Sequence, residues 1–265
     1  MQVVNRLRWR GPPWTSVVSL TAAIPALFAQ IAIAAPHSRK GRIDMQLFTS
    51  SIGRKILMAI TGLFMVLFVI VHLLGNSSVF AGPGGLNAYA EHLHSMPLPI
   101  IAGFRCVMLL VVCVHIWFGI QLTIENSCGR PQQYAVKATQ KATFASENMI
   151  WTGLLLLAFI VYHLLQFTFR VTPDVAAFAG QVPGNVFGMV VTSFKNFFVA
   201  FIYAAAMVTL FLHLSHGIQS FFQTLGWNND RVQPGITKAG TLVALILFLG
   251  FVAIPLTIFA GILKG

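Results

Sequence analysis

The sequence predicts an all-α membrane protein, a bundle of five transmembrane helices, and two observations predict it. Of its 265 residues, 57% are hydrophobic and only 9% are charged, whereas a soluble domain carries about 25% charged residues. Five segments after residue 50 each hold about 20 mostly apolar residues, the length that spans a bilayer as a helix. This composition excludes a soluble globular enzyme, a disordered chain and a nucleic-acid-binding protein. The net charge of +11 reflects a shortage of acidic residues rather than a dense basic patch.

The predicted spans follow one another with short linkers between them. They cover Ile56–Leu74, Leu98–Ile124, Met149–Phe169, Phe197–Phe222 and Thr241–Ile262. Strands of a membrane barrel are shorter and alternate in polarity, so each span is expected to be a helix. Turn-forming residues mark the linkers, at Gly82-Pro83-Gly84-Gly85, Pro131, Pro183-Gly184 and Pro234-Gly235.

Loop lysines and arginines predict the orientation, because cytoplasmic loops carry an excess of both. The stretch ahead of the first span holds Arg39, Lys40, Arg42, Arg54 and Lys55, whereas the loop of residues 75–97 holds none. We therefore expect a multi-pass protein of the cell inner (cytoplasmic) membrane, with its N-terminus in the cytoplasm and its C-terminus outside.

Residues 1–44 are expected to form an N-terminal extension ahead of the five-helix domain of residues 45–265, and we expect this extension to be sequence upstream of the true translation start at Met45. Arginines precede an apolar stretch that ends in Ala32-Ile33-Ala34, which imitates a signal peptide. A cleaved signal would place the new N-terminus outside, against the loop charges. The alternative is an extra amphipathic or spanning segment.

Four successive spans each contain a histidine at membrane depth: His72, His115, His163 and His213. Ionisable groups at such depth are costly and usually face the bundle interior with a partner. One such histidine is readily explained as a hydrogen-bonded packing residue, but four in successive helices point to a shared role.

Helix direction sorts these histidines into two levels. His72 and His163 lie about 14–16 residues beyond the inner ends of their spans, which places them in the outer part of the membrane. His115 and His213 lie about 16–17 residues beyond the outer ends of theirs, which places them in the inner part. We call His72 and His163 the outer pair, and His115 and His213 the inner pair.

Two stacked pairs of neutral imidazoles suit two six-coordinate b haems, with both axial positions filled and no open site for oxygen chemistry. The chain has no C-x-x-C-H motif for covalent haem attachment. Gly119 and Gly217 each follow an inner-pair histidine by four residues, on the same helix face, where a flat macrocycle needs a small neighbour. Ordinary close helix packing is the alternative explanation of these glycines.

Three further residues are candidates for the site. His216 lies three residues beyond His213; it suits a haem propionate or a quinone, or is simply interfacial. Arg105 lies in the outer part of the second span, where it either pairs with a propionate of the outer haem or snorkels to the interface. Glu91, with neighbouring histidines, either exchanges protons with a quinone or belongs to a solvated turn.

An ordered set of segments resembles the diheme cytochrome b membrane-anchor subunit of succinate dehydrogenase/fumarate reductase (succinate:quinone oxidoreductase) over about residues 46–265. The segments are SIGRKILMAITGLFMVLFVIVHLLGN (51–76), GLNAYAEHL (85–93), residues 105–119, WTGLLLLAFIVYH (151–163) and HLSHGIQSFFQTLG (213–226).

This resemblance implies a five-helix anchor with two b haems, the distal one held by His72 and His163 and the proximal one by His115 and His213. It also implies a flavoprotein partner, an iron–sulfur subunit docked on the inner face, and quinone, often menaquinone, as the membrane substrate. Glu91 roughly matches an acidic position near the outer end of the second helix in that family.

Two alternatives remain from the sequence. One is the diheme cytochrome b anchor of another quinone-linked dehydrogenase, such as a hydrogenase or formate dehydrogenase. The other is a haem-free transporter in which the histidines relay protons, although transporters tend to show inverted repeats and broken helices.

Overall fold

The computed structural model describes residues 48–129, 142–181 and 184–264. The chain divides into two compact units, Met1–Ser50 and Ser51–Gly265, and the second contains all the helices considered below. The extension expected for residues 1–44 lies outside the described residues, so that division of the chain stays a prediction.

Five long helices form the second unit, and within the described residues there is no β-strand. They are α3 (Ser51–Asn76), α5 (Leu98–Cys128), α7 (Met149–His163), α10 (Phe197–Thr224) and α11 (Gln233–Phe259). A π-helical turn, η2 (Leu164–Thr168), continues α7. Five candidate spans contain these helices and are long and apolar enough to cross a membrane. The predicted fold class, an all-α bundle with five spans, is therefore confirmed.

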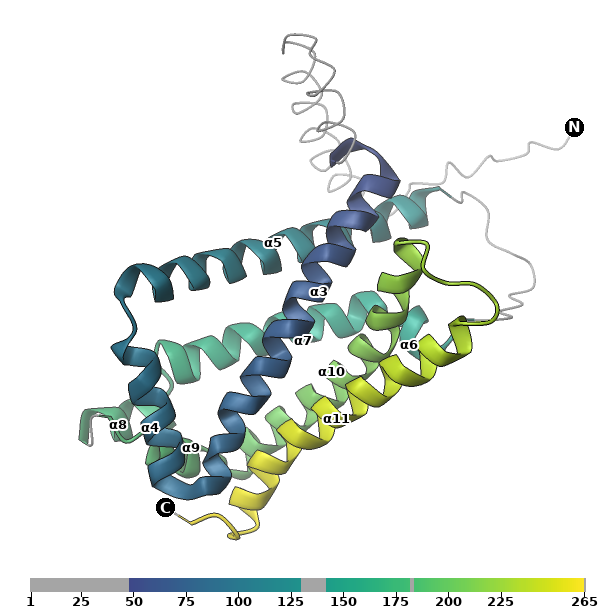
Figure 1. Ribbon diagram of the computed structural model, residues 1–265. Coiled ribbons are helices and arrows are strands. Elements are labelled where there is room, and N and C mark those ends of the chain that lie inside the picture. Colours follow the sequence, from purple (N-terminus) through teal and green to yellow (C-terminus); the bar gives the residue numbers. More distant parts are fainter. Residues whose placement is uncertain (1–47, 130–141, 182–183, 265) are drawn as a thin grey trace, which may run out of the picture. The chain divides into compact units, whose positions relative to one another are not determined.

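The five helices pack both on helices that are next to them in the sequence and on helices that are distant in the sequence (Figure 1). Helix α10 makes its most extensive contact with α11 and also packs on α3 and α7, while α5 packs mainly on α3. A bidentate ion pair joins the start of α3 to the end of α5: two nitrogens of the Arg54 guanidinium lie 2.8 and 2.9 Å from the two carboxylate oxygens of Glu125. This pair fixes α3 and α5 as antiparallel neighbours. It also places both charges at the predicted inner ends of these helices.

The linkers are more structured than the turn signals predicted. The segment that begins at Gly82-Pro83 is a helix, α4 (Gly82–Ser95), preceded by the short helix η1 (Ser77–Ala81). Proline is accepted in a first helical turn because its missing N–H has no partner there. Gly82 stands at φ 75°, which lets the chain leave η1 and start a new helix. The third linker likewise contains α8 (Pro173–Gln181) and α9 (Val186–Phe194).

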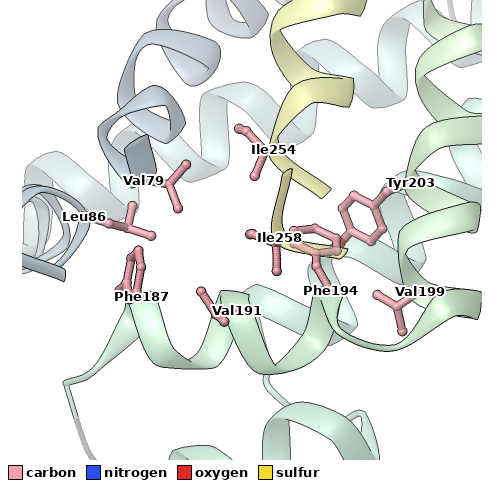
Figure 2. Packing of buried hydrophobic residues seen from close by; sticks show 9 residues of the cluster. All are labelled: Val79, Leu86, Phe187, Val191, Phe194, Val199, Tyr203, Ile254 and Ile258. Atoms are coloured by element: carbon pink, nitrogen blue, oxygen red, sulfur yellow. The ribbon is translucent and has the colours of Figure 1, made fainter. Parts of the chain in front are cut away.

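The largest buried apolar cluster lies where these short helices meet the ends of the long ones. Figure 2 shows its residues, which come from η1, α4, α9, α10 and α11: Val79, Leu86, Phe187, Val191, Phe194, Val199, Tyr203, Ile254 and Ile258. Asn87 ties α4 to α9, because its Oδ1 accepts from the Phe187 N–H at 2.8 Å and its Nδ2 donates to Asn185 at 3.2 Å. The short helices thus close one end of the bundle.

Candidate functional site: two histidine pairs

The four histidines of the spans lie in two pairs, each with one ring from each half of the bundle. The rings of His72 on α3 and His163 on α7 have centroids 5.8 Å apart, at an interplanar angle of 89°. The rings of His115 on α5 and His213 on α10 have centroids 6.4 Å apart, at 66°. The structure therefore brings together the same residues that the depth argument sorted into outer and inner pairs.

The inner-pair separation of 6.4 Å matches that of two imidazoles that bind one metal ion from opposite sides, and the outer-pair separation of 5.8 Å is slightly shorter. With metal–nitrogen bonds of about 2.0 Å and each ring centroid about 1.15 Å behind its nitrogen, the centroids lie about 6.3 Å apart. Direct hydrogen bonding between two rings would bring the centroids closer than this, since ring nitrogens in a hydrogen bond are about 2.9 Å apart.

The inner pair is held by partners that fix its tautomers. His115 Nδ1 lies 3.1 Å from the Met58 carbonyl oxygen, and a carbonyl only accepts, so Nδ1 carries the proton. The Thr61 hydroxyl, 3.3 Å away, donates to the Leu57 carbonyl of its own helix and leaves its oxygen to accept. In the neutral ring Nε2 then keeps its lone pair, the state that binds a metal.

His213 repeats this arrangement on the other side. Its Nδ1 lies 3.1 Å from the hydroxyl oxygen of Thr152, and that hydroxyl reaches the carbonyls of Asn148 and Met149 at 3.1 and 3.0 Å. The hydroxyl donates to its own helix, so His213 donates from Nδ1 and also presents Nε2. Such outer hydrogen bonds orient metal-binding imidazoles in proteins.

The outer pair is less symmetrical. His163 Nδ1 lies 3.0 Å from the Tyr203 hydroxyl. Within the described residues, neither ring nitrogen of His72 has a hydrogen-bond partner. Its ring instead stacks on Phe68, with centroids 5.2 Å apart, and lies 5.9 Å from the ring of Phe251.

Glycines surround the inner pair from both sides. A Cβ at Gly217 would meet nothing within 4 Å, and one at Gly119 would meet only the Met58 sulfur at 3.9 Å. Open space therefore lies beside the two glycines that the sequence singled out. On the facing helices, a Cβ at Gly62 would lie 3.2 Å from His115 Cε1, and one at Gly153 would lie 3.4 Å from His213 Cε1. These two glycines leave room for the imidazoles themselves.

The sequence analysis did not predict the roles of Thr61, Gly62, Thr152 and Gly153, although all four belong to a repeated sequence motif. Helices α3 and α7 share the pattern T-G-L-x4-F-x3-H, from Thr61 to His72 and from Thr152 to His163, and in both the histidine is the eleventh residue after the threonine. Each copy thus carries a threonine for an inner-pair ring and a histidine of the outer pair. Eleven residues of helix rise about 16 Å, which is the distance between the two levels along each helix.

The other predicted site residues are not drawn into these pairs. Arg105 and Glu91 are exposed, and within the described residues neither makes a hydrogen bond or ion pair. His216 is half-buried on α10, one turn beyond His213, and its ring likewise has no hydrogen-bond partner in the described part of the chain. The roles expected for these three residues stay predictions.

The donor set fits haem better than a bare metal ion. A bare transition-metal ion needs more ligands than two imidazoles, and among the described residues no group of three or more His, Cys, Asp or Glu side chains comes together. Haem brings its own equatorial ligands and needs two axial ones. The ring separations, the presented Nε2 atoms and the space beside Gly119 and Gly217 all fit such a group.

The fold and the paired histidines define a class, the polytopic α-helical membrane proteins with imidazoles paired inside the bundle. A family model described as the succinate dehydrogenase/fumarate reductase transmembrane subunit matches residues 34–145 and 130–254. The chain belongs to this family and is a membrane-anchor subunit of a succinate dehydrogenase or fumarate reductase. Among curated proteins and among solved structures, none matches the chain.

Proposed function

We propose that this subunit carries electrons between the iron–sulfur subunit of its complex and a membrane quinone through two b haems, each held by two histidines. His115 and His213 hold the inner haem, and His72 and His163 hold the outer one. The flavoprotein subunit of the same complex handles succinate and fumarate. Family membership leaves the hydrogenase or formate dehydrogenase anchor without support.

Bound haem supplies a one-electron couple with no open coordination position. The chain's own residues hold and orient it. Thr61, Met58 and Thr152 keep the inner imidazoles in the tautomer that presents Nε2. The apolar helices keep water away from both levels, and the two histidines of each pair would leave no coordination position for oxygen.

The orientation proposed from the loop charges places the inner pair toward the cytoplasm, where the iron–sulfur subunit docks. The outer pair then lies toward the opposite face of the inner membrane, near the quinone, for which menaquinone is the proposed species. Glu91 serves as a proton-exchanging group there. Arg105 pairs with an outer propionate, and His216 bonds an inner propionate or quinone. The domain that does this work is residues 45–265, with residues 1–44 as an extension.

The observation that supports this proposal is the pairing itself: the two rings of each pair lie with centroids 5.8 and 6.4 Å apart, and three of the four rings have Nδ1 in a hydrogen bond, so that Nε2 would be free to hold the haem.

The test is the haem content of the complex purified from its native membrane. We expect two protohaems per subunit and two b-type components in a redox titration. His163→Ala should remove one component and leave the other, and His213→Ala should do the reverse, so each variant is the control for the other. Absence of protohaem from the wild-type complex, or survival of both components in either variant, would contradict the proposal.

A further inference from the structure

A chain of hydrogen bonds leads from the outer-pair histidine of α7 to a carboxylate. His163 Nδ1 contacts the Tyr203 hydroxyl at 3.0 Å, and that hydroxyl donates to Gln166 Oε1 at 2.7 Å. Gln166 Nε2 in turn donates to Asp174 Oδ2 at 2.7 Å. The Ser193 hydroxyl donates to the same carboxylate oxygen at 2.8 Å.

The carboxylate of Asp174, at the end of this hydrogen-bond chain, fixes the donor and the acceptor of every bond in it. A carboxylate only accepts, so Gln166 must present its amide nitrogen to Asp174 and its oxygen to Tyr203. Tyr203 then gives its proton to that oxygen and accepts from His163 Nδ1–H. All donors therefore point away from the imidazole and toward the negative charge, and hydrogen bonds aligned in this way strengthen one another.

The middle of this hydrogen-bond chain is buried, Asp174 at its end is half-buried, and Gln166 lies where the helix departs from α-helical geometry. Gln166 and Ser193 are fully buried, and Tyr203 is 7% exposed. Gln166 lies in the π-helical turn η2, directly after His163. The wider turn changes the register that an α-helix would impose, and such turns often occur at functional sites. Asp174 lies in the first turn of α8, where the helix dipole favours a negative charge.

No other ring of the two pairs has such a connection among the described residues. The inner rings end on threonine hydroxyls and a backbone carbonyl, which are neutral. The ring of His72 contacts the rings of Phe68 and Phe251 and, within the described residues, makes no hydrogen bond. Within the described residues, His163 is thus the one ring of the four that a chain of hydrogen bonds connects to a carboxylate.

We propose that Tyr203, Gln166 and Asp174 are positioning residues that make His163 the more electron-donating ligand of the outer haem. The inference rests on the proposed function. An imidazole whose Nδ1–H is drawn toward an anionic chain is more basic at Nε2, and more basic ligands stabilise the oxidised iron. The outer haem is therefore harder to reduce than its aromatic surroundings alone would make it.

The test is a redox titration of the purified wild-type complex and of Tyr203→Phe. The phenylalanine keeps the ring that packs on Phe194 and Phe159, and it removes only the hydroxyl. We expect the outer component to become easier to reduce, by about tenfold in the reduced-to-oxidised ratio at fixed potential, or about 59 mV for one electron. The inner component should not move. Tyr162→Phe is the matched control, since this neighbouring tyrosine lies outside the hydrogen-bond chain.

Asp174→Asn gives a second measurement, because it removes the charge and keeps the shape. It should shift the outer component in the same direction by a smaller amount, and it should change the low-spin electron paramagnetic resonance signal of that component. If Tyr203→Phe loses the outer haem, the Asp174→Asn shift decides the question. Two haems with unshifted potentials in both variants would overturn this inference and leave the proposed function standing, whereas a wild-type complex without haem would overturn the proposed function.

Discussion

A methyl group added at Gly62 should disturb the inner pair specifically. In Gly62→Ala the new Cβ would lie 3.2 Å from Cε1 and 3.6 Å from Nδ1 of His115. Carbon atoms in contact ordinarily lie about 3.5–4.0 Å apart, so the ring must yield by about 0.3–0.8 Å. Its bonds to Met58 and Thr61, at 3.1 and 3.3 Å, resist that movement.

The expected energy follows from two opposing effects. Overpacking of this kind costs about 1–3 kcal/mol, while replacing glycine by alanine inside a helix gains about 1 kcal/mol. Gly62→Ala should therefore destabilise the subunit by up to about 2 kcal/mol. Gly103→Ala is the control, because a Cβ there would meet nothing within 4 Å and only the gain remains. The two variants should differ by about 1–3 kcal/mol.

The assay is thermal unfolding of the purified complex, read together with the redox spectrum of the inner component. A difference of 1 kcal/mol corresponds to about 2–4 °C in a chain of this size. Gly153→Ala, with its Cβ 3.4 Å from His213 Cε1, should fall between the other two. The reasoning fails if Gly62→Ala melts as high as Gly103→Ala and has an unchanged inner spectrum.

Two further predictions concern single hydrogen-bonding side chains. Thr152→Val leaves the Nδ1–H of His213 without its acceptor, which costs about 1–3 kcal/mol. In a redox titration the potential of the inner component should shift while that of the outer component stays unchanged. Thr209→Val is the control and should shift neither potential, because the Thr209 hydroxyl donates to the Ala205 carbonyl of its own helix. Asn87→Ala removes both links between α4 and α9 and should lower the free energy of unfolding by about 1–2 kcal/mol. Asn126→Ala on the exposed end of α5 is its control in the same melting experiment, and equal melting of the two would refute the linking role.

The sequence predicted all five long helices because each contains a long apolar segment, although α3 and α11 begin at Ser51 and Gln233, ahead of the predicted starts at Ile56 and Thr241. The predicted spans beginning at Leu98, Met149 and Phe197 begin at those residues in the structure. The short helices α4, α8 and α9 were not predicted, because nine to fourteen residues give too weak a periodic signal. At Gly82-Pro83 the turn residues mark the beginning of a helix rather than a loop.

The site was predictable in its histidines but not in what surrounds them. A histidine at membrane depth is conspicuous, and helix direction alone gave the two levels at which the rings meet. Thr61 and Thr152 are inconspicuous, because a threonine in a membrane helix ordinarily bonds its own backbone, as both also do. Gln166, which bonds Tyr203, lies in a π-helical turn, and the 3.6-residue period of an α-helix does not reveal such a turn.

Each histidine pair unites the two halves of the chain, since α3 and α5 supply one ring to each level and α7 and α10 supply the other. A nascent chain that has inserted only its first two spans has two single imidazoles and no completed pair. Closure of both pairs therefore depends on docking of the later helices. A group held between the rings of a pair would then link the two halves of the chain.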